Sequence, residues 1–172
     1  MNSSAVPHVA FLALGPTFPQ YVSAAMGVVH NIEAFAGARI HGAARYTNSM
    51  VQYHVVIEEG VTERAQQAIS ARAPATTQGR VHLHSASSDE LHTRLSSTTS
   101  GNGATFLRKC LMHRVLPVWV PRVIVLDTDV FVLHDIGELW RLFDRFPLGA
   151  LIGVAEEQCP SYKDVCFTGS TL

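Results

Sequence analysis

The chain has 172 residues, of which 47% are hydrophobic and 16% charged, and its formal net charge is −1. This length is enough for one domain with a sizeable core and argues against two full domains. The small net charge, without any Lys/Arg cluster interleaved with aromatic residues, argues against a nucleic-acid partner. No apolar run reaches the roughly 18 residues of a membrane span, so no membrane segment is predicted.

Strands and helices alternate along the first three quarters of the sequence. Short runs of β-branched and apolar residues, or in Arg80–His84 an alternation of polar and apolar residues, predict strands. Longer stretches, with apolar residues at helical spacing or rich in helix-forming residues, predict helices. Gly15-Pro16 ends the first strand, and Pro117 ends the third helix. In chain order the predicted elements are a strand at His8–Leu14, a helix at Gln20–Phe35, a strand at His54–Ile57, a helix at Thr62–Ala73, a strand at Arg80–His84, a helix at Phe106–Leu116 and a strand at Val123–Leu126.

After the last of these strands the chain is expected to stay extended through Asp127-Thr128-Asp129 and Val130–Leu133. Asp135 and Glu138 then form a capping-box pattern at the start of a further helix. This helix places Ile136, Leu139, Trp140 and Phe143 on one face, and a final strand is predicted at Ala150–Val154. Alternating strands and helices indicate crossover units and a mostly parallel sheet. Such a sheet binds ligands at the carboxyl ends of its strands.

The sequence VIVLDTDVFVL carries the clearest chemical signal. Two carboxylates, Asp127 and Asp129, follow directly after a strand that is apolar on both faces. At positions i and i+2 of extended backbone, both side chains point to the same side. Two close carboxylates repel each other unless a cation or hydrogen-bond donors compensate. A hard divalent ion supplies this compensation and can bridge diphosphate oxygens as well.

Two other interpretations of these carboxylates exist. A bare D-x-D is common by chance and is often a solvated turn, but its place after a buried strand favours function. The motif also resembles the start of haloacid-dehalogenase-type phosphatases. That family wants Thr or Val where this chain has Phe131, and its motif lies near the chain start. The phosphatase is therefore a remote alternative.

A family resemblance becomes specific between residues 105 and 162. The stretch Arg122-Val-Ile-Val-Leu-Asp127-Thr-Asp129, followed by Asp135-Ile-Gly-Glu138-Leu-Trp140, resembles glycosyltransferases of the glycogenin/LARGE type. HVAFLALG also resembles the opening strand of that family. The resemblance implies a GT-A (Rossmann-like) α/β fold with a mostly parallel sheet flanked by helices. It implies a UDP-sugar donor, a manganese or magnesium ion, a glycan or glycoprotein acceptor, and transfer with retention of configuration.

The same resemblance assigns site residues. Asp127 and Asp129 would bind the metal, and with Thr128 they would hold the donor. Lys109 matches a basic residue that is thought to reach the donor. The uridine would lie at the end of the first strand, against Ala13, Leu14 and Gly15. Glu156 and Gln158 match positions near the sugar or the acceptor. No residue is assigned as a catalytic nucleophile.

The resemblance covers the donor-binding part of such an enzyme, so residues 1–172 are expected to form one incomplete GT-A-type domain, truncated before the acceptor side. The alternative is a non-catalytic nucleotide-sugar-binding or interaction module. Location in the Golgi or another secretory lumen follows from the resemblance, whereas the sequence itself, which shows no signal or anchor, leaves the cytoplasm open.

Histidines and tryptophans outside this motif suggest no site by themselves. His82 and His84 alternate on one strand face, but no third ligand stands at a suitable spacing. They are therefore expected to be surface histidines of a strand. Trp119 and Trp140 are expected to pack at the core or its rim.

Overall fold

The computed structural model describes residues 6–15, 17–36, 51–77, 79–87 and 108–154. The chain divides into two compact units, Met1–Arg141 and Leu142–Leu172. The first unit contains a four-stranded sheet in the order β3-β2-β1-β4. Its strands are β1 (His8–Ala13), β2 (Gln52–Glu58), β3 (Val81–Ala86) and β4 (Ile124–Leu126). Every neighbouring pair is parallel, which confirms the prediction of a parallel sheet.

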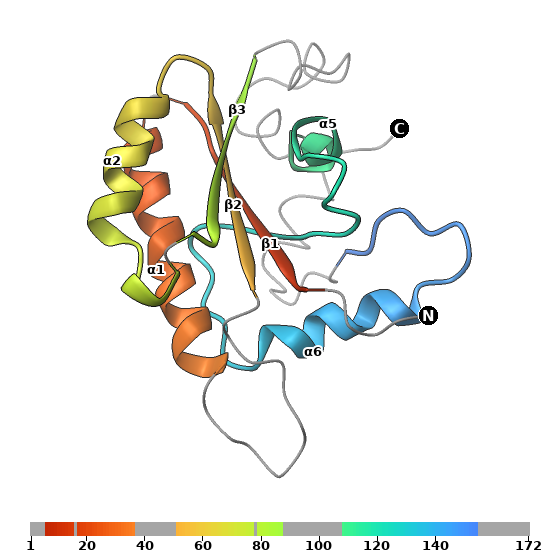
Figure 1. The fold of residues 1–172 in the computed structure, drawn as a ribbon. Helices are drawn as coiled ribbons and strands as arrows, with labels where there is room; N and C mark the ends of the chain where they lie inside the picture. The colour runs from red at the N-terminus through yellow and green to blue at the C-terminus, as the bar shows by residue number, and fades with distance from the viewer. Residues whose placement is uncertain (1–5, 16, 37–50, 78, 88–107, 155–172) are drawn as a thin grey trace, which may run out of the picture. The chain divides into compact units, whose positions relative to one another are not determined.

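Helices cover both faces of this sheet (Figure 1). On one side lie α1 (Phe18–Ala36) and α2 (Thr62–Arg72), and on the other lies α5 (Met112–Val115), which follows the 3-10 helix η4 (Lys109–Leu111). The short 3-10 helix η2 (Ala75–Thr77) links α2 to β3. No helix in the described ranges is long and apolar enough to cross a bilayer.

The two faces of the sheet are formed by alternate residues of its strands. On the α1 side, β1 and β2 bury Val9, Phe11, Tyr53 and Val55 completely. On the α5 side a separate cluster joins strand and helix residues, and its buried members are Ala10, Leu14, Val56, Ala86, Met112 and Leu116. The continuous apolar runs seen in the sequence therefore reflect strands that are buried on both faces.

A buried ion pair fixes α1 against the sheet. Arg80 Nη2 lies 2.8 Å from Glu33 Oε2, and the two side chains are only 11% and 10% exposed. The Tyr53 hydroxyl donates to Glu33 Oε1 over 2.5 Å. Burial and this contact with the Glu33 carboxylate raise the pKa of the Tyr53 phenol, so Tyr53 stays protonated. The network ties α1, β2 and the start of β3 together.

Most predicted elements are confirmed, with ends that shift by a few residues. The helix α6 (Ile136–Trp140) begins as expected, because the Asp135 carboxylate accepts a hydrogen bond of 2.9 Å from the Gly137 amide. Its predicted apolar face is only partly buried, since Ile136 and Trp140 are each 3% exposed whereas Leu139 is 42% exposed. Phe106, the predicted start of the third helix, lies outside the described residues.

Two predicted extended segments are wrong. Residues 130–133 belong to no strand, and Phe131 is 73% exposed. Residues 150–154 also form no strand, and Leu151 and Val154 are 92% and 89% exposed. A strand needs a neighbouring backbone to satisfy its amides, and neither segment pairs with another strand in the described part of the chain.

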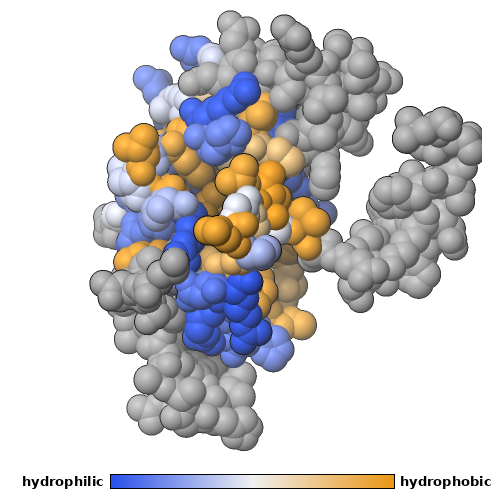
Figure 2. All heavy atoms as spheres, turned by 90° about the vertical axis from the view of Figure 1, so that its right-hand side faces the viewer, coloured by the Kyte–Doolittle hydropathy of each residue, from blue (hydrophilic) through white to orange (hydrophobic). Residues whose placement is uncertain are grey.

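The second unit is described from residues 142 to 154. The 3-10 helix η5 (Arg141–Arg145) enters this unit, and the rings of Phe143 and Phe146 lie 5.2 Å apart there. A turn at Gly149, with φ of 89°, follows. Figure 2 shows that one side of the molecule carries hydrophobic and hydrophilic residues next to one another.

Candidate functional site

The carboxyl ends of β1 and β4 form the candidate site. These strands are adjacent and parallel, with Phe11 paired to Leu126. Both strands therefore end at the same edge of the sheet. β1 continues into Leu14-Gly15, and β4 continues into Asp127-Thr128-Asp129. The carboxyl edge is where open parallel sheets bind their ligands. The structure thus brings the first-strand residues of the predicted donor site to the same edge as the predicted metal ligands.

The two carboxylates of the motif stand in different surroundings. Asp127 forms an ion pair with Lys109, in which Lys109 Nζ contacts Asp127 Oδ1. The side chain of Asp127 is 53% exposed, and that of Lys109 is 22% exposed. Asp129 is also exposed, and within the described part of the chain it has no ion-pair partner. Lys109 comes from η4, 18 residues earlier in the sequence. The structure therefore places Lys109 against the D-x-D motif, and its contact with a donor stays a prediction.

The backbone of the motif differs from the expected one. The strand ends at Leu126, and Thr128 and Asp129 lie in a turn rather than in extended chain. The prediction of an extended backbone that carries both carboxylates on one side is therefore wrong. A turn is the usual place for Asp and Thr, whose side chains compete for backbone hydrogen bonds.

The end of β1 offers its backbone rather than its side chains. Ala13 is completely buried, and the Leu14 side chain, 5% exposed, packs in the core cluster. Gly15 has φ of 85°, and a Cβ placed on it would meet no atom within 4 Å among the described residues other than its chain neighbours. A ligand at this position would therefore contact main-chain groups of Ala13 and Leu14, and it could approach Gly15 closely because Gly15 has no side chain.

The donor set at this edge fits a hard divalent ion. Carboxylate and hydroxyl oxygens, such as those of Asp127, Thr128 and Asp129, are the ligands that Mg²⁺ and Mn²⁺ prefer. Among the described residues, however, no group of three or more His, Cys, Asp or Glu side chains could hold a metal ion. An ion here would keep several waters or take further oxygens from a bound diphosphate.

Other residues near this site are only partly described. Glu156 and Gln158, the predicted sugar or acceptor contacts, lie outside the described residues. Arg108, the residue before Lys109, has a buried Nε without a hydrogen-bond partner in the described part of the chain.

A second polar cluster, which the sequence did not predict, lies on the α5 side of the sheet. His8 Nδ1 is 2.9 Å from His54 Nε2, and His54 Nδ1 is 2.9 Å from His84 Nε2. His82 Nε2 lies 2.8 Å from Gln52 Oε1, and its ring stacks on His54 with centroids 5.2 Å apart. His8, His54, His82 and His84 are called the histidine cluster below.

The histidine cluster is buried under aromatic rings. His54 is completely buried, and His8 is 7% exposed. Trp119 lies 5.5 Å from the His54 ring and 5.4 Å from the His82 ring, and Trp140 lies 6.0 Å from His8. The expectation that His82 and His84 are surface histidines is therefore wrong, because both are partly buried and packed against other rings. Trp140 packs at the core as predicted.

Burial keeps these histidines neutral. It lowers the pKa of His54 to about 3, with further lowering from the charges that His84, His8 and His82 would carry. The pKa values of His8, His82 and His84 are lowered as well, in each case mainly by burial. When the histidines are neutral, each His–His contact needs one nitrogen that donates and one that accepts. The tautomers of His8, His54 and His84 are therefore coupled.

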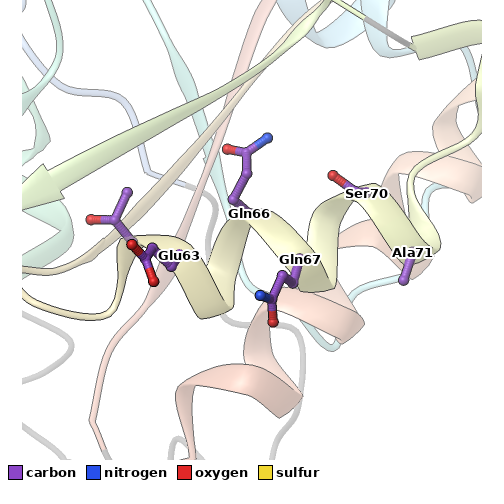
Figure 3. Close-up of a pocket in the computed structure, with 6 residues that line it drawn as sticks. Glu63, Gln66, Gln67, Ser70 and Ala71 are labelled. Atoms are coloured by element: carbon purple, nitrogen blue, oxygen red, sulfur yellow. The ribbon is translucent and has the colours of Figure 1, made fainter.

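A shallow depression on α2 is a further candidate site, but its residues do not converge on one point. It is lined by Thr62, Glu63, Gln66, Gln67, Ser70 and Ala71, all from a single helix. Figure 3 shows Gln66 and Gln67 pointing away from each other on opposite sides of that helix. Side chains that diverge around a helix do not surround a ligand. The depression is therefore an exposed helix surface.

Comparison with known proteins gives partial similarities. No protein-family model matches the chain. It is 39% identical to mouse xyloside xylosyltransferase 1 over 67 residues, which are 39% of this chain and 17% of that protein. It is 44% identical to mouse xylosyl- and glucuronyltransferase LARGE2 over 61 residues, or 36% of this chain and 9% of the relative. Human LARGE1 is 36% identical over 85 residues, 48% of this chain and 11% of the relative.

The fold has a solved counterpart. The crystal structure of mouse xyloside xylosyltransferase 1 in its apo form matches with a TM-score of 0.60 and 21% identity, over 95% of this chain and 56% of that one. This likeness confirms the predicted α/β fold of the GT-A kind. The sequence matches confirm a resemblance to glycosyltransferases, with LARGE proteins among them, and do not single out glycogenin. The matched stretches cover 17% or less of the length of these curated relatives.

Proposed function

We propose that this chain is the donor-binding part of a metal-dependent glycosyltransferase that moves a sugar from a UDP-sugar to a glycan or glycoprotein acceptor. One observation carries the proposal. Asp127 and Asp129 stand at the carboxyl end of β4, beside the end of β1, and Lys109 contacts Asp127, in a chain that resembles xylosyl- and glucuronyltransferases. The motif thus combines acidic metal ligands with a cation at the edge where such a sheet binds its ligand.

The residues of the site have separate roles in this proposal. Asp127 and Asp129 would hold a manganese or magnesium ion, which neutralises the charge that develops on the departing diphosphate. Lys109 adds one positive charge beside that diphosphate. The main chain of Ala13 and Leu14 would face the uridine, and the open side of Gly15 lets the nucleotide approach closely. Retention of configuration is proposed from the family resemblance alone.

The acceptor and the location are proposed on the same resemblance. A glycan or glycoprotein would be the acceptor, and Glu156 and Gln158 are the proposed contacts with it or with the donor sugar. The Golgi or another secretory lumen is the proposed location. Fluorescence microscopy of the chain expressed with a tag in cells checks that location against Golgi and cytoplasmic markers.

A titration of UDP tests the proposed site. Isothermal titration calorimetry should show UDP binding that requires Mn²⁺ and that weakens about tenfold or more in the double variant Asp127→Asn/Asp129→Asn, since each carboxylate supplies a charge-assisted contact through the ion. The matched control is Glu63→Gln, which neutralises an exposed carboxylate on α2. Binding that is indifferent to Mn²⁺, or that falls in Glu63→Gln instead, contradicts the proposal.

A non-catalytic nucleotide-sugar-binding module is the second candidate. It is favoured by the surroundings of the motif, because Asp127 and Asp129 are exposed and Asp127 already has Lys109 as its ion-pair partner. Release of UDP from UDP-xylose or UDP-glucuronic acid separates the two candidates. Release that depends on Mn²⁺ and on Asp127 supports the enzyme, whereas tight binding without release supports the module.

A further inference from the structure

We infer that Lys109 holds the place of the divalent cation at Asp127 until the donor arrives, and that its ammonium group then moves from Asp127 to an ion pair with the diphosphate. Lys109 would thereby oppose the binding of the metal alone and favour the binding of metal and nucleotide together. The inference rests on the proposed function and adds an order of binding to it.

The contact between Lys109 and Asp127 provides the geometric basis. The ammonium lies against Asp127 Oδ1, so the oxygen that would bind a cation already has a positive partner. The two groups come from distant parts of the chain, η4 and the segment after β4, so no local turn forces the contact. Asp129, two residues further on, has no ion-pair partner within the described part of the chain and stays open to a cation.

The physical properties of lysine make the exchange feasible. Its ammonium is a compact charge on a flexible four-carbon stem, so it can move by several ångströms without movement of the backbone. Asp127 is half exposed, and an exposed ion pair is weak enough to be displaced by a divalent ion. Once displaced, the ammonium finds a stronger partner in a diphosphate, whose oxygens accept charge-assisted hydrogen bonds.

Opposite effects on two affinities follow. Without nucleotide, the positive charge of Lys109 repels the metal and competes for Asp127, so its removal should tighten Mn²⁺ binding by about two- to tenfold. With nucleotide, the same removal deletes a phosphate contact, so UDP binding in the presence of Mn²⁺ should weaken by about tenfold. A residue with only a structural role would change both affinities in the same direction or leave both unchanged.

Electron paramagnetic resonance of free Mn²⁺ measures the first affinity on the full chain, and calorimetry with UDP in saturating Mn²⁺ measures the second. Lys109→Met removes the charge while keeping a long side chain, and Lys109→Arg keeps the charge. The matched control is Arg114→Gln, which removes one exposed positive charge from α5. Circular dichroism melts confirm that each variant is folded.

The expected result is tighter Mn²⁺ binding and weaker UDP binding in Lys109→Met, with Arg114→Gln and Lys109→Arg close to the unmodified chain in Mn²⁺ affinity. If Lys109→Met binds Mn²⁺ no more tightly while the unmodified chain binds UDP through Asp127, the inference is wrong and the proposed function stands. If the folded, unmodified chain binds neither Mn²⁺ nor UDP, both are wrong.

Discussion

Acidification should destabilise the fold through the histidine cluster. In the unfolded chain a histidine takes up a proton near pH 6.5, whereas burial lowers the pKa of His54 in the folded chain to about 3. Between these two values the unfolded state binds more protons than the folded state. The free energy of unfolding therefore falls as the pH drops below about 6.5, and it continues to fall until about pH 3.

The magnitude for His54 follows from these two pKa values. Between pH 7.5 and pH 5.5 the protonation of unfolded His54 favours the unfolded state about tenfold, or about 1.4 kcal/mol, because the folded form stays neutral over this range. His8, His82 and His84, whose pKa values are also lowered, add to the loss in the same direction. The total should therefore exceed the contribution of His54 alone.

Urea denaturation at pH 7.5, 6.5 and 5.5 measures this loss. The pH window stays above the range in which carboxylates take up protons, so the histidines dominate the change. The variant His54→Gln keeps a polar side chain that can donate and accept hydrogen bonds. Its free energy of unfolding should depend less on pH, because about one proton fewer is taken up on unfolding at low pH. A free energy of unfolding that is equal at pH 7.5 and pH 5.5, or higher at pH 5.5, would refute the reasoning.

Two further predictions concern stability. Glu33→Gln leaves Arg80 without the carboxylate of a pair that is about nine-tenths buried, and it should lower the free energy of unfolding by about 3 kcal/mol in urea denaturation; a loss below about 1 kcal/mol would mean that the pair is effectively solvated. Asp135→Ala removes the hydrogen bond to the Gly137 amide and should cost about 1 kcal/mol by the same method. Asp135→Asn keeps an oxygen acceptor and should therefore retain most of the stability that Asp135→Ala loses. Equal losses of stability in both variants would exclude a capping role.

The sheet could be predicted because β1, β2 and β4 are short, mainly apolar runs and β3 alternates between apolar and polar residues. β1 and β2 are buried on both faces, so their hydrophobic runs are nearly continuous and unambiguous in the sequence. The helix α1 was predicted from apolar residues at helical spacing, and its observed ends, Phe18 and Ala36, differ from the predicted ones by two residues or fewer. Fraying and irregular last turns make such differences usual.

Apolar runs without a pairing partner could not be interpreted correctly. The segment 150–154 has the composition of a strand, yet Leu151 is 92% exposed. The composition of a segment indicates only that it could form a strand. Whether it pairs with another strand depends on residues far away in the sequence. The same reason explains residues 130–133, which follow β4 but do not extend it.

The histidine cluster was missed for a related reason. His82 and His84 alternate along β3, a pattern that also fits a strand with one face in water. Only the register, which places His54 of β2 opposite His82, shows that the histidines meet. Register between strands is set by the whole fold. A weak signal was present, because the sequence places histidines in three of the five predicted strands.

The sequence indicated more of the candidate site than of the histidine cluster. A strand followed by D-x-D suggests a ligand site at the end of that strand, and this holds whichever strands pair with it. Asp127 and Asp129 were assigned from the residues and Lys109 from the family resemblance, and the structure adds a contact between Lys109 and Asp127 that was not predicted. The turn at Thr128-Asp129 could not be foreseen, because extended and turn conformations both accommodate these residues.

A crystal structure of the chain with UDP and Mn²⁺, with an anomalous difference map recorded near the manganese edge, tests the central claim most directly. The account predicts one anomalous peak within bonding distance of Asp127 and Asp129 oxygens and of the diphosphate, with the uridine against the main chain of Ala13 and Leu14. A nucleotide bound elsewhere, or a manganese peak away from both carboxylates, would contradict it.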